Sequence, residues 1–344
     1  KNPVIIAGHE IVTSEALDEI ASFASTIGAP VYQQTVPHGA HFLSEHPCFM
    51  GALSRQQPEV KACLSKHDLM VCVGSDVLRM SVWHTVDALP EELPIVQIGL
   101  DDWEMGKNYP TELAIRADVK ETLAALIPVL EDLLDASQIE QRQANVLELS
   151  RCNWTANRDR LKQVVLKHTE DSPIDPRVLM LRIAEYVPQE GVIVDESIAS
   201  GFSLLSFLPF RDSRCFFGLS SGGIGFAVAG AIGMKLAQPD RPMVVVLGDG
   251  SSLYNIQALW TAAHLGLQMT YVIANNRGYR ILKERLSAFH GNRNFIGMNF
   301  DQPVIDFVGL ANSFGVPAEC VGSAAEIIPA LERADSSPGP SLIE

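Results

Sequence analysis

The sequence is short of basic residues. It contains 26 Lys and Arg against 41 Asp and Glu, a formal net charge of -15 at pH 7, and its basic side chains form no separate patch. This balance repels a polyanion such as the phosphate backbone of a nucleic acid. We therefore expect no nucleic-acid partner.

Long apolar runs are also missing. The most apolar long stretch, Gly222 to Ala237, contains Lys235 and repeated glycines. It is shorter than the roughly 20 apolar residues that a bilayer crossing needs. We therefore expect no membrane span.

The cysteines form no motif. Six are present, they lie far apart without a C-x-x-C pair, and Cys72 sits inside an apolar run where free thiols usually pack. The first residues also lack the layout of a signal peptide. These features predict a protein of the reducing cytoplasm.

Both ends of the sequence run into strand-like segments. Lys1 to Gly8 becomes apolar within a few residues, and Ser341 to Glu344 stops inside another such run. Because natural termini usually fray at the surface, we expect this sequence to be a piece of a longer chain.

The remaining composition is that of a globular α/β protein. The 344 residues are 47% hydrophobic and 19% charged, which favours two domains. Short apolar runs alternate with amphipathic stretches, as in a parallel sheet covered by helices. The first strands are expected at Pro3 to Ala7, Pro30 to Gln33, Leu69 to Gly74, Pro94 to Gly99 and Leu113 to Ala117.

A helix is expected between the first two strands. Thr13 to Glu15 opens it, and Gly28 closes it. The dinucleotide fingerprint G-x-G-x-x-G is missing after the first strand, where Gly8-His9-Glu10 stands instead. We expect a Rossmann-like shape here without that fingerprint.

The chain divides into two domains and a linker. Residues 136–173 are rich in Gln, Asn, Arg, Lys and Glu, which is typical of a polar helix and crossover. The expected fold class is α/β, with Rossmann-like domains of parallel strands flanked by helices at residues 1–135 and 174–344. In the second domain we expect helices at Arg177 to Tyr186, from Gly222 onward and at Ser251 to Leu265, and strands at Val192 to Asp195, Met243 to Leu247 and Met269 to Asn275.

Two polar motifs follow neighbouring strands of the second domain. An unbroken apolar strand ends in Gly248-Asp249-Gly250, and the next strand ends in Asn275-Asn276. A strand-helix-strand crossover makes these strands parallel, so Asp249 and Asn276 are expected at the same edge of the sheet.

This juxtaposition predicts a metal diphosphate site. A carboxylate and an amide oxygen are hard ligands that suit Mg²⁺, which completes its shell with phosphate oxygens and water. The amides of Gly250 and Ser251 lie where a helix begins, a position that favours phosphate.

The spacing of GDG and NN resembles the thiamine diphosphate motif. The whole chain resembles the middle and C-terminal diphosphate-binding domains of the thiamine diphosphate-dependent decarboxylase and acetolactate synthase superfamily, and it is most similar to the benzoylformate decarboxylases. Ser221 to Ala227 (SGGIGFA) and His46 to Phe49 (HPCF) also fit this pattern.

The resemblance implies a role for each of several residues. Mg²⁺ would be held by Asp249, Asn276 and the backbone carbonyl of Gly278. The diphosphate and the rest of the cofactor would meet Gly250, Ser251, Tyr279, the backbone of Ile198 and Ala199, the carbonyl of Gly222, and Ile224 as the wedge that bends the cofactor.

Some of these residues have other interpretations. The glycines around Gly222 also suit close helix packing, and Ile224 also suits an ordinary core. Glu196, after the strand that ends at Asp195, is either a residue that orders this loop or a solvated acid.

The resemblance also implies decarboxylation of a 2-oxo acid. Superfamily active sites form between subunits, so a homodimer or homotetramer is expected. The activating glutamate belongs to an N-terminal pyrimidine-binding domain of a neighbouring subunit, and we expect that third α/β domain to be missing from this sequence. We therefore expect the chain alone to bind cofactor weakly and to catalyse nothing, and its parent enzyme to be active.

The substrate-facing residues are less well defined. Ser81 stands where the benzoylformate decarboxylases place a catalytic histidine, and His84 follows as a substitute or an exposed helix-end side chain. Arg285, on a helix expected over the pocket, is either a partner for the substrate carboxylate or a side chain that caps the surface. Three further histidines are interpreted as a polar loop and given no chemistry: His38, His41 and His46.

Three other functions compete with decarboxylation. An acetolactate synthase-like carboligase would use the same cofactor site. A non-catalytic cofactor-binding module is disfavoured by the intact Asp249 and Asn276. A nicotinamide-dependent oxidoreductase is disfavoured because Gly223-x-Gly225 lacks the third glycine of the fingerprint.

Overall fold

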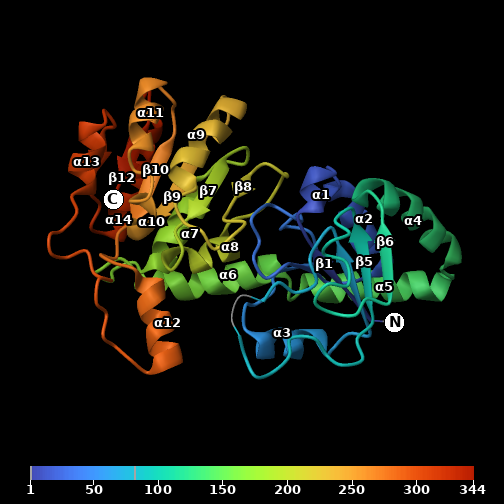
Figure 1. The fold of residues 1–344 in the computed structure, drawn as a ribbon. Coiled ribbons are helices and arrows are strands. Elements are labelled where there is room, and N and C mark those ends of the chain that lie inside the picture. The colour runs from blue at the N-terminus through green and yellow to red at the C-terminus, as the bar shows by residue number, and fades with distance from the viewer. Residues whose placement is uncertain (1, 81–82) are drawn as a thin grey trace. The chain divides into compact units, whose positions relative to one another are not determined.

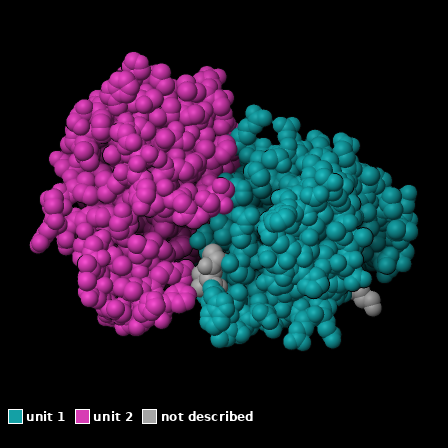
Figure 2. Space-filling model, viewed as in Figure 1, with its two compact units in different colours: residues 1–160, 209–214 teal, residues 161–208, 215–344 magenta. Residues whose placement is uncertain are grey.

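The computed structural model describes residues 2–80 and 83–344 (Figure 1). The chain forms two compact units, which Figure 2 colours separately. Unit 1 comprises Lys1–Arg160 and Pro209–Arg214, and unit 2 comprises Leu161–Leu208 and Cys215–Glu344. A short segment therefore returns to unit 1 after unit 2 has begun, so no single cut in the sequence separates the two units.

Unit 1 contains a sheet of six parallel strands in the order β3-β2-β1-β4-β5-β6. This is the doubly wound order, in which the chain changes direction across the sheet between β1 and β4. The strands are β1 (Pro3–Ala7), β2 (Val31–Gln33), β3 (Phe49–Ala52), β4 (Leu69–Val73), β5 (Ile95–Gly99) and β6 (Leu113–Arg116).

Five of these strands were expected and β3 was not. The pairing of β3 with β2 shifts register between Val31 and Tyr32. Gly51 within β3 has a φ of 102°, a left-handed conformation that favours glycine. The short run and its glycine weaken the alternation by which a strand is recognised in a sequence.

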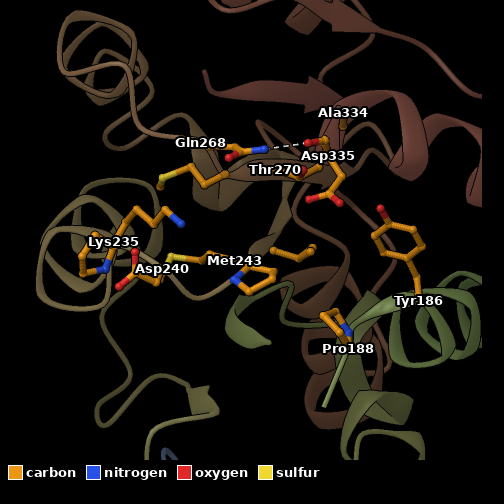
Figure 3. Close-up of a pocket in the computed structure, with 13 residues that line it drawn as sticks. Tyr186, Pro188, Lys235, Asp240, Met243, Gln268, Thr270, Ala334 and Asp335 are labelled. Carbon is orange, nitrogen blue, oxygen red and sulfur yellow. Dashed lines mark hydrogen bonds between the residues drawn. The ribbon is translucent and has the colours of Figure 1, made fainter. Parts of the chain in front are cut away.

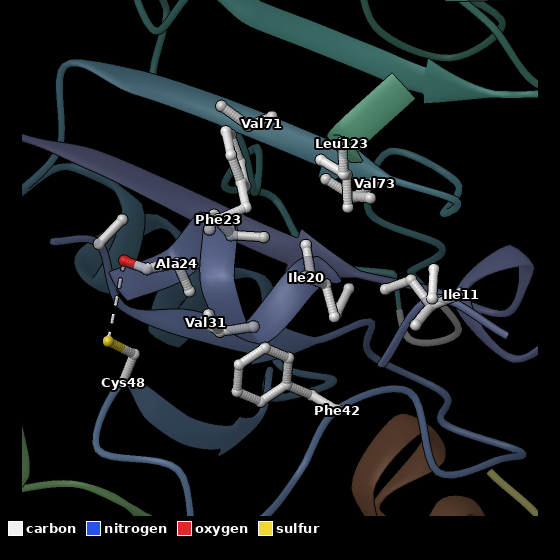
Figure 4. Packing of buried hydrophobic residues seen from close by; sticks show 14 of the residues in the cluster. Ile11, Ile20, Phe23, Ala24, Val31, Phe42, Cys48, Val71, Val73 and Leu123 are labelled. Atoms are coloured by element: carbon white, nitrogen blue, oxygen red, sulfur yellow. Dashed lines mark hydrogen bonds between the residues drawn. The ribbon is translucent and has the colours of Figure 1, made fainter. Parts of the chain in front are cut away.

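Helices cover both faces of this sheet. Neighbouring strand residues point to opposite faces, so Ile5 joins one core and Val4 and Ile6 join the other. Figure 4 shows the first core, in which Phe23 of α2 packs against strand residues such as Val71. The helices are α1 (Glu10–Thr13), α2 (Leu17–Ile27), α3 (Gln57–Leu64), α4 (Val119–Leu133), α5 (Ala136–Ser150) and α6 (Trp154–Val165).

Unit 2 contains a second sheet of six parallel strands, in the order β11-β12-β10-β9-β7-β8. The chain passes from β7 to β8 on one side and then to β9 on the other. The strands are β7 (Val192–Glu196), β8 (Phe216–Phe217), β9 (Met243–Gly248), β10 (Thr270–Ala274), β11 (Ala318–Glu319) and β12 (Ser341–Ile343). Together the two sheets confirm the predicted α/β class.

The helices of unit 2 also lie on two faces of its sheet. A core of strand residues such as Val245 packs against α9, α11 and α13, and α7 packs against α14, which contacts β10 and β12. The helices are α7 (Pro176–Tyr186), α8 (Leu204–Phe207), α9 (Ala227–Ala237), α10 (Asp249–Ser252), α11 (Ala258–His264), α12 (Arg280–His290), α13 (Phe307–Ser313) and α14 (Ala324–Asp335), with the 3-10 helices η1 (Leu166–His168) and η2 (Ser200–Ser203).

Two helices differ from the sequence-based expectation. The helix expected from Gly222 begins only at Ala227, after Gly225 adopts a φ of 101°. The helix expected over Ser251 to Leu265 is two helices, α10 and α11, separated by turns. The segment expected as a polar helix and crossover, residues 136–173, holds α5, α6 and η1.

None of the helices that the structure describes pairs enough length with enough apolar character to cross a bilayer.

Candidate functional site

Asp249 is the first residue of α10 and follows β9 directly. Its carboxylate is buried and accepts hydrogen bonds from the backbone amides of Gly250 and Gly278, both at 2.8 Å. Burial raises the pKa of this carboxyl, while the amides of Gly250 and Gly278 oppose that shift. Backbone dipoles hold the acid in place.

The loop after β10 meets Asp249 at the same edge of the sheet. The strands β9 and β10 are parallel, and Gly248 pairs with Ala274. Arg277, with a φ of 58°, turns the chain so that the Gly278 amide reaches Asp249. Asn276 lies exposed in this loop. The sequence thus predicted correctly that both strand ends lie at one edge.

Two glycines allow close packing at this edge. A Cβ on Gly250 would stand 2.6 Å from the ring of Tyr279, and a Cβ on Gly278 would stand 2.2 Å from the carbonyl oxygen of Met298. The Tyr279 ring packs edge-on against Phe300, with centroids 4.8 Å apart. Burial raises the pKa of the Tyr279 hydroxyl.

Glu196 ties the glycine-rich tract to the end of β7. Its carboxylate is buried and accepts hydrogen bonds from the amides of Gly225 and Ala227, the latter at 2.6 Å. This negative charge lies at the beginning of α9, where a helix favours it. Of the two interpretations of Glu196, the structure therefore supports the ordering role, and the side chain is not solvated.

The remaining predicted residues of the tract are more open. Gly222 is exposed, Ile224 is half-buried, and the side-chain amide of Asn255 donates to the carbonyl of Gly225. Glu196 at the end of β7 and Asn255 in the turns after α10 therefore fix the tract from two sides of the sequence.

Ile198 and Ala199 follow β7 as a tight turn. Ile198 has a φ of 49°, a strained conformation for a β-branched residue, and Ala199 precedes η2. A Cβ on Gly248 would stand 3.5 Å from the carbonyl oxygen of Ser197. The turn after β7 therefore lies beside the beginning of α10, where Ser251 is buried.

The turn after β7 and the beginning of α10 meet at the switch point of the sheet, where the chain reverses its direction across the strands. The chain places β8 and β9 on opposite sides of β7, and ligands of doubly wound proteins bind in the crevice at the carboxyl ends of such strands. In unit 1, the carboxylate of Glu10, after β1, accepts hydrogen bonds from the amides of Leu100 and Asp101, after β5.

The structure places three substrate candidates differently. Ser81 lies outside the described residues. His84 is exposed in a loop and not at a helix end, and its Nδ1 accepts from the amide of Val86 at 3.2 Å. Arg285 is half-buried on α12, the helix that was expected after Asn276.

A pocket of unit 2 lies at the opposite edge of the sheet. Figure 3 shows it at the amino ends of β9 and β10, with Tyr186, Lys235 and Asp335 in its wall. The Lys235 ammonium donates to the carbonyl of Arg241 at 2.8 Å. The side-chain amide of Gln268 donates to the carbonyl of Asp335 at 2.7 Å. This pocket is therefore separate from the edge that holds Asp249.

Sequence reasoning missed two polar residues at the Asp249 edge. Asn255 holds the carbonyl of Gly225, and the ammonium of Lys283 contacts the side chain of Asn299, beside Gly278. No local pattern in the sequence marks either residue, because Asn299 and Gly225, their partners, are distant in the chain.

The donor set at this edge suits a divalent cation that carries an anion. It offers a buried carboxylate, an amide side chain and a backbone carbonyl, all oxygen donors of the kind that Mg²⁺ prefers. The two hydrogen bonds to Asp249 leave acceptor capacity, because a carboxylate has about four lone-pair positions.

Comparison with known proteins defines the class. Residues 1–126 match the family model "Thiamine pyrophosphate enzyme, central domain". Residues 200–344 match "Thiamine pyrophosphate enzyme, C-terminal TPP binding domain". The chain belongs to the thiamine pyrophosphate enzyme family.

Three individual proteins are similar to the chain over its whole length. The chain is 27% identical to a benzoylformate decarboxylase of Pseudomonas aeruginosa, covering 100% of this chain and 61% of the relative. It is also 27% identical to a probable acetolactate synthase large subunit of Methanococcus aeolicus, and this match covers 100% of this chain and 58% of the relative. Among solved structures, the chain aligns with a thiamine diphosphate-dependent 4-hydroxybenzoylformate decarboxylase of Rhodococcus jostii, with a TM-score of 0.84 at 26% identity. This match covers 100% of this chain and 61% of the other. The chain thus spans about three fifths of the length of these relatives.

Proposed function

We propose that this protein holds thiamine diphosphate through Mg²⁺ at the carboxyl edge of the unit 2 sheet and decarboxylates a 2-oxo acid of the benzoylformate type. The observation that carries the proposal is the buried carboxylate of Asp249, hydrogen-bonded to Gly278 of the loop after β10. The similarity to two benzoylformate-type decarboxylases supports the substrate class.

Each predicted residue has a place in this proposal. The Mg²⁺ ligands are Asp249, Asn276 and the carbonyl of Gly278, which also accepts from the amide of Arg280 and keeps a second lone pair. The cofactor is held by Gly250, Ser251, Tyr279, the backbone of Ile198 and Ala199, the carbonyl of Gly222, and Ile224.

Thiamine diphosphate, when bound, supplies the electron sink that makes loss of carbon dioxide from a 2-oxo acid feasible. The chain's own contribution is positioning. Glu196 and Asn255 fix the tract that carries Gly222 and Ile224, and Asp249 fixes the loop that carries Asn276. We further propose that the activating glutamate comes from a pyrimidine-binding domain, which neither described unit provides.

We propose that the active enzyme is a homodimer or homotetramer. Apolar side chains are exposed on α12 and in the loop after it, including Leu282, Phe289 and Ile296. Exposed apolar side chains of this kind are suited to burial at a subunit interface.

We propose the cytoplasm as the compartment. Cys48 and Cys72 are buried as thiols, and burial raises the pKa of each to about 12, which keeps them unreactive. This arrangement suits a reducing environment.

A carboligase is the second candidate, and the similarity to a probable acetolactate synthase large subunit supports it. The two reactions differ in their products. Supplied with benzoylformate or pyruvate, the purified enzyme should release an aldehyde as a decarboxylase, whereas a carboligase should form a hydroxy-keto acid.

The cofactor site is tested through Asp249. The substitution Asp249→Asn keeps the shape of the side chain but removes its charge, so we expect it to weaken binding of thiamine diphosphate with Mg²⁺ by about 100-fold or more. Isothermal titration calorimetry measures this affinity. Asp240→Asn is the matched control, because Asp240 is an exposed acid at the opposite edge of the same sheet.

A second variant separates loss of the metal site from misfolding of the protein. Asn276 is exposed, so Asn276→Ala should fold normally and still weaken binding. Unchanged affinity in both variants would refute the proposed metal site.

A further inference from the structure

Unit 1 contains a cluster of three histidines that the proposed function does not use. His9 follows β1, while His38 and His41 lie in the loop after β2. One ring nitrogen from each residue lies within 4.8 Å of the others. The ring centroids of His9 and His38 are 4.6 Å apart, and those of His38 and His41 are 5.2 Å apart.

His41 is the innermost residue of this cluster, and its ring lacks the hydrogen-bond partners that a buried imidazole needs. It is fully buried, and among the described residues neither of its ring nitrogens has a hydrogen-bond partner. A buried polar atom without a partner costs free energy, and a ligand bound by this ring would recover that cost. This burial corrects the expectation that His41 belongs to a polar loop.

His38 adds a second nitrogen of the same kind. Its Nδ1 is buried and has no hydrogen-bond partner among the described residues. His9 is exposed, so the cluster extends from the buried His41 ring to the surface. A small ion can therefore reach the cluster from solvent. His46 takes no part, because its ring nitrogens meet the Ser25 hydroxyl and the Cys48 amide.

Gly39 lies against the His41 ring and presents no side chain to it. A Cβ on Gly39 would stand 3.2 Å from Nε2 of His41, so the glycine keeps this nitrogen uncrowded by a side chain. The nearby guanidinium of Arg79 is paired with Asp76, which offsets its charge.

We propose that His9, His38 and His41 form a binding site for a divalent transition metal ion, with Zn²⁺ as the ion that fits best. Three imidazoles with one position left for water is an established zinc coordination set. Zn–N bonds of about 2.0 Å in a tetrahedron place ligand nitrogens roughly 3.3 Å apart. Rotation of the side chains would bring nitrogens that lie within 4.8 Å of one another to this spacing.

The bound ion would join two segments distant in the sequence. His9 lies two residues after the end of the first strand, and the other two ligands lie about thirty residues later in the loop that leaves the second strand. The ion would fasten this loop to the carboxyl edge of the unit 1 sheet.

The test is a Zn²⁺ titration of untagged protein from which metals have been removed with a chelator. We expect one saturable site per chain by calorimetry. His9→Ala removes a ligand from the exposed side and should weaken Zn²⁺ binding by about 100-fold or more, while the fold stays intact. His290→Ala, an exposed histidine of α12, is the matched control and should leave the affinity unchanged.

A spectroscopic measurement identifies the ligands. Co²⁺ bound at this site should give the visible absorption of a tetrahedral nitrogen-ligated ion, and His9→Ala should abolish it. Absence of a saturable site, or equal Zn²⁺ affinity in the wild-type protein and His9→Ala, would overturn the proposal. Neither measurement requires thiamine diphosphate, so failure here is distinguishable from failure of the cofactor site.

Discussion

Asp195 is a half-buried acid whose ionisation opposes folding. Burial raises the pKa of its carboxyl from 3.8 to about 6, although the hydroxyl and amide of Ser197 donate to it. The folded state thus holds this proton more tightly than the unfolded state. The stabilisation is present below about pH 4 and is lost as the pH rises through about 6.

We predict that Asp195→Asn abolishes this loss of folding stability at higher pH. A pKa shift of about two units corresponds to about 3 kcal/mol, so the variant should gain up to that much stability relative to the wild-type protein between about pH 4 and pH 7. Urea denaturation across this range measures the difference. Asp132→Asn, at an exposed position on α4, should show no such pH-dependent gain.

Arg285 is the residue that we expect to meet the substrate carboxylate. It lies half-buried on α12, one turn from Leu282, and a guanidinium pairs with a carboxylate through two parallel hydrogen bonds. Arg285→Ala should raise KM for the 2-oxo acid about tenfold or more and change kcat less. Steady-state kinetics of the purified enzyme measure both constants. Unchanged kinetics would remove Arg285 from the site.

At the scale of elements, the beginning of α9 depends on a single glycine. Gly225 has a φ of 101°, and a Cβ there would stand 2.7 Å from Cβ of Tyr254. Gly225→Ala should therefore lower the free energy of unfolding by about 1–3 kcal/mol. It should also weaken cofactor binding, because the tract is displaced from Glu196. Urea denaturation and calorimetry test the two effects.

A second glycine of the same helix provides the control. Gly233 lies exposed within α9, and a Cβ there would meet no atom within 4 Å. Gly233→Ala should raise the free energy of unfolding by about 0.5–1 kcal/mol, since alanine loses less backbone entropy in a helix. Equal effects of the two substitutions would contradict the role given to Gly225.

The elements also show where sequence patterns succeed. The α2 helix ends where Gly28, with a φ of 64°, caps it, and glycine at that position is a local signal. The strand β9 was recognisable because its unbroken apolar run matches burial on both faces of the sheet. The break between α10 and α11 was not recognisable, because the Asn255 side chain in that turn bonds to a distant carbonyl at Gly225.

At the scale of the whole molecule, the proposed assembly gives a direct test. If active sites form between subunits, the purified enzyme should have the mass of a dimer or a tetramer in solution. Light scattering coupled to size-exclusion chromatography measures this mass. Ile296→Asp, which places a charge on an exposed apolar side chain, should shift the enzyme toward smaller species. A monomer that retains full activity would refute the assembly.

The division into units was only partly accessible from the sequence. The Pro209–Arg214 segment belongs to unit 1, although its neighbours on both sides belong to unit 2. The amide and carbonyl of Phe210 bond to Ser44, a partner far away in the sequence. Composition describes a stretch of chain and carries no information about such a partner.

The sequence by itself determined the α/β class, most of the strands, and the Asp249 and Asn276 motifs at one sheet edge. These follow from periodicity and from the rule that a crossover makes its two strands parallel, and both are local properties. Only the tertiary structure decided that Glu196 holds the glycine-rich tract and that His9 joins His38 and His41. Those contacts connect segments distant along the chain, and their formation depends on how whole elements pack.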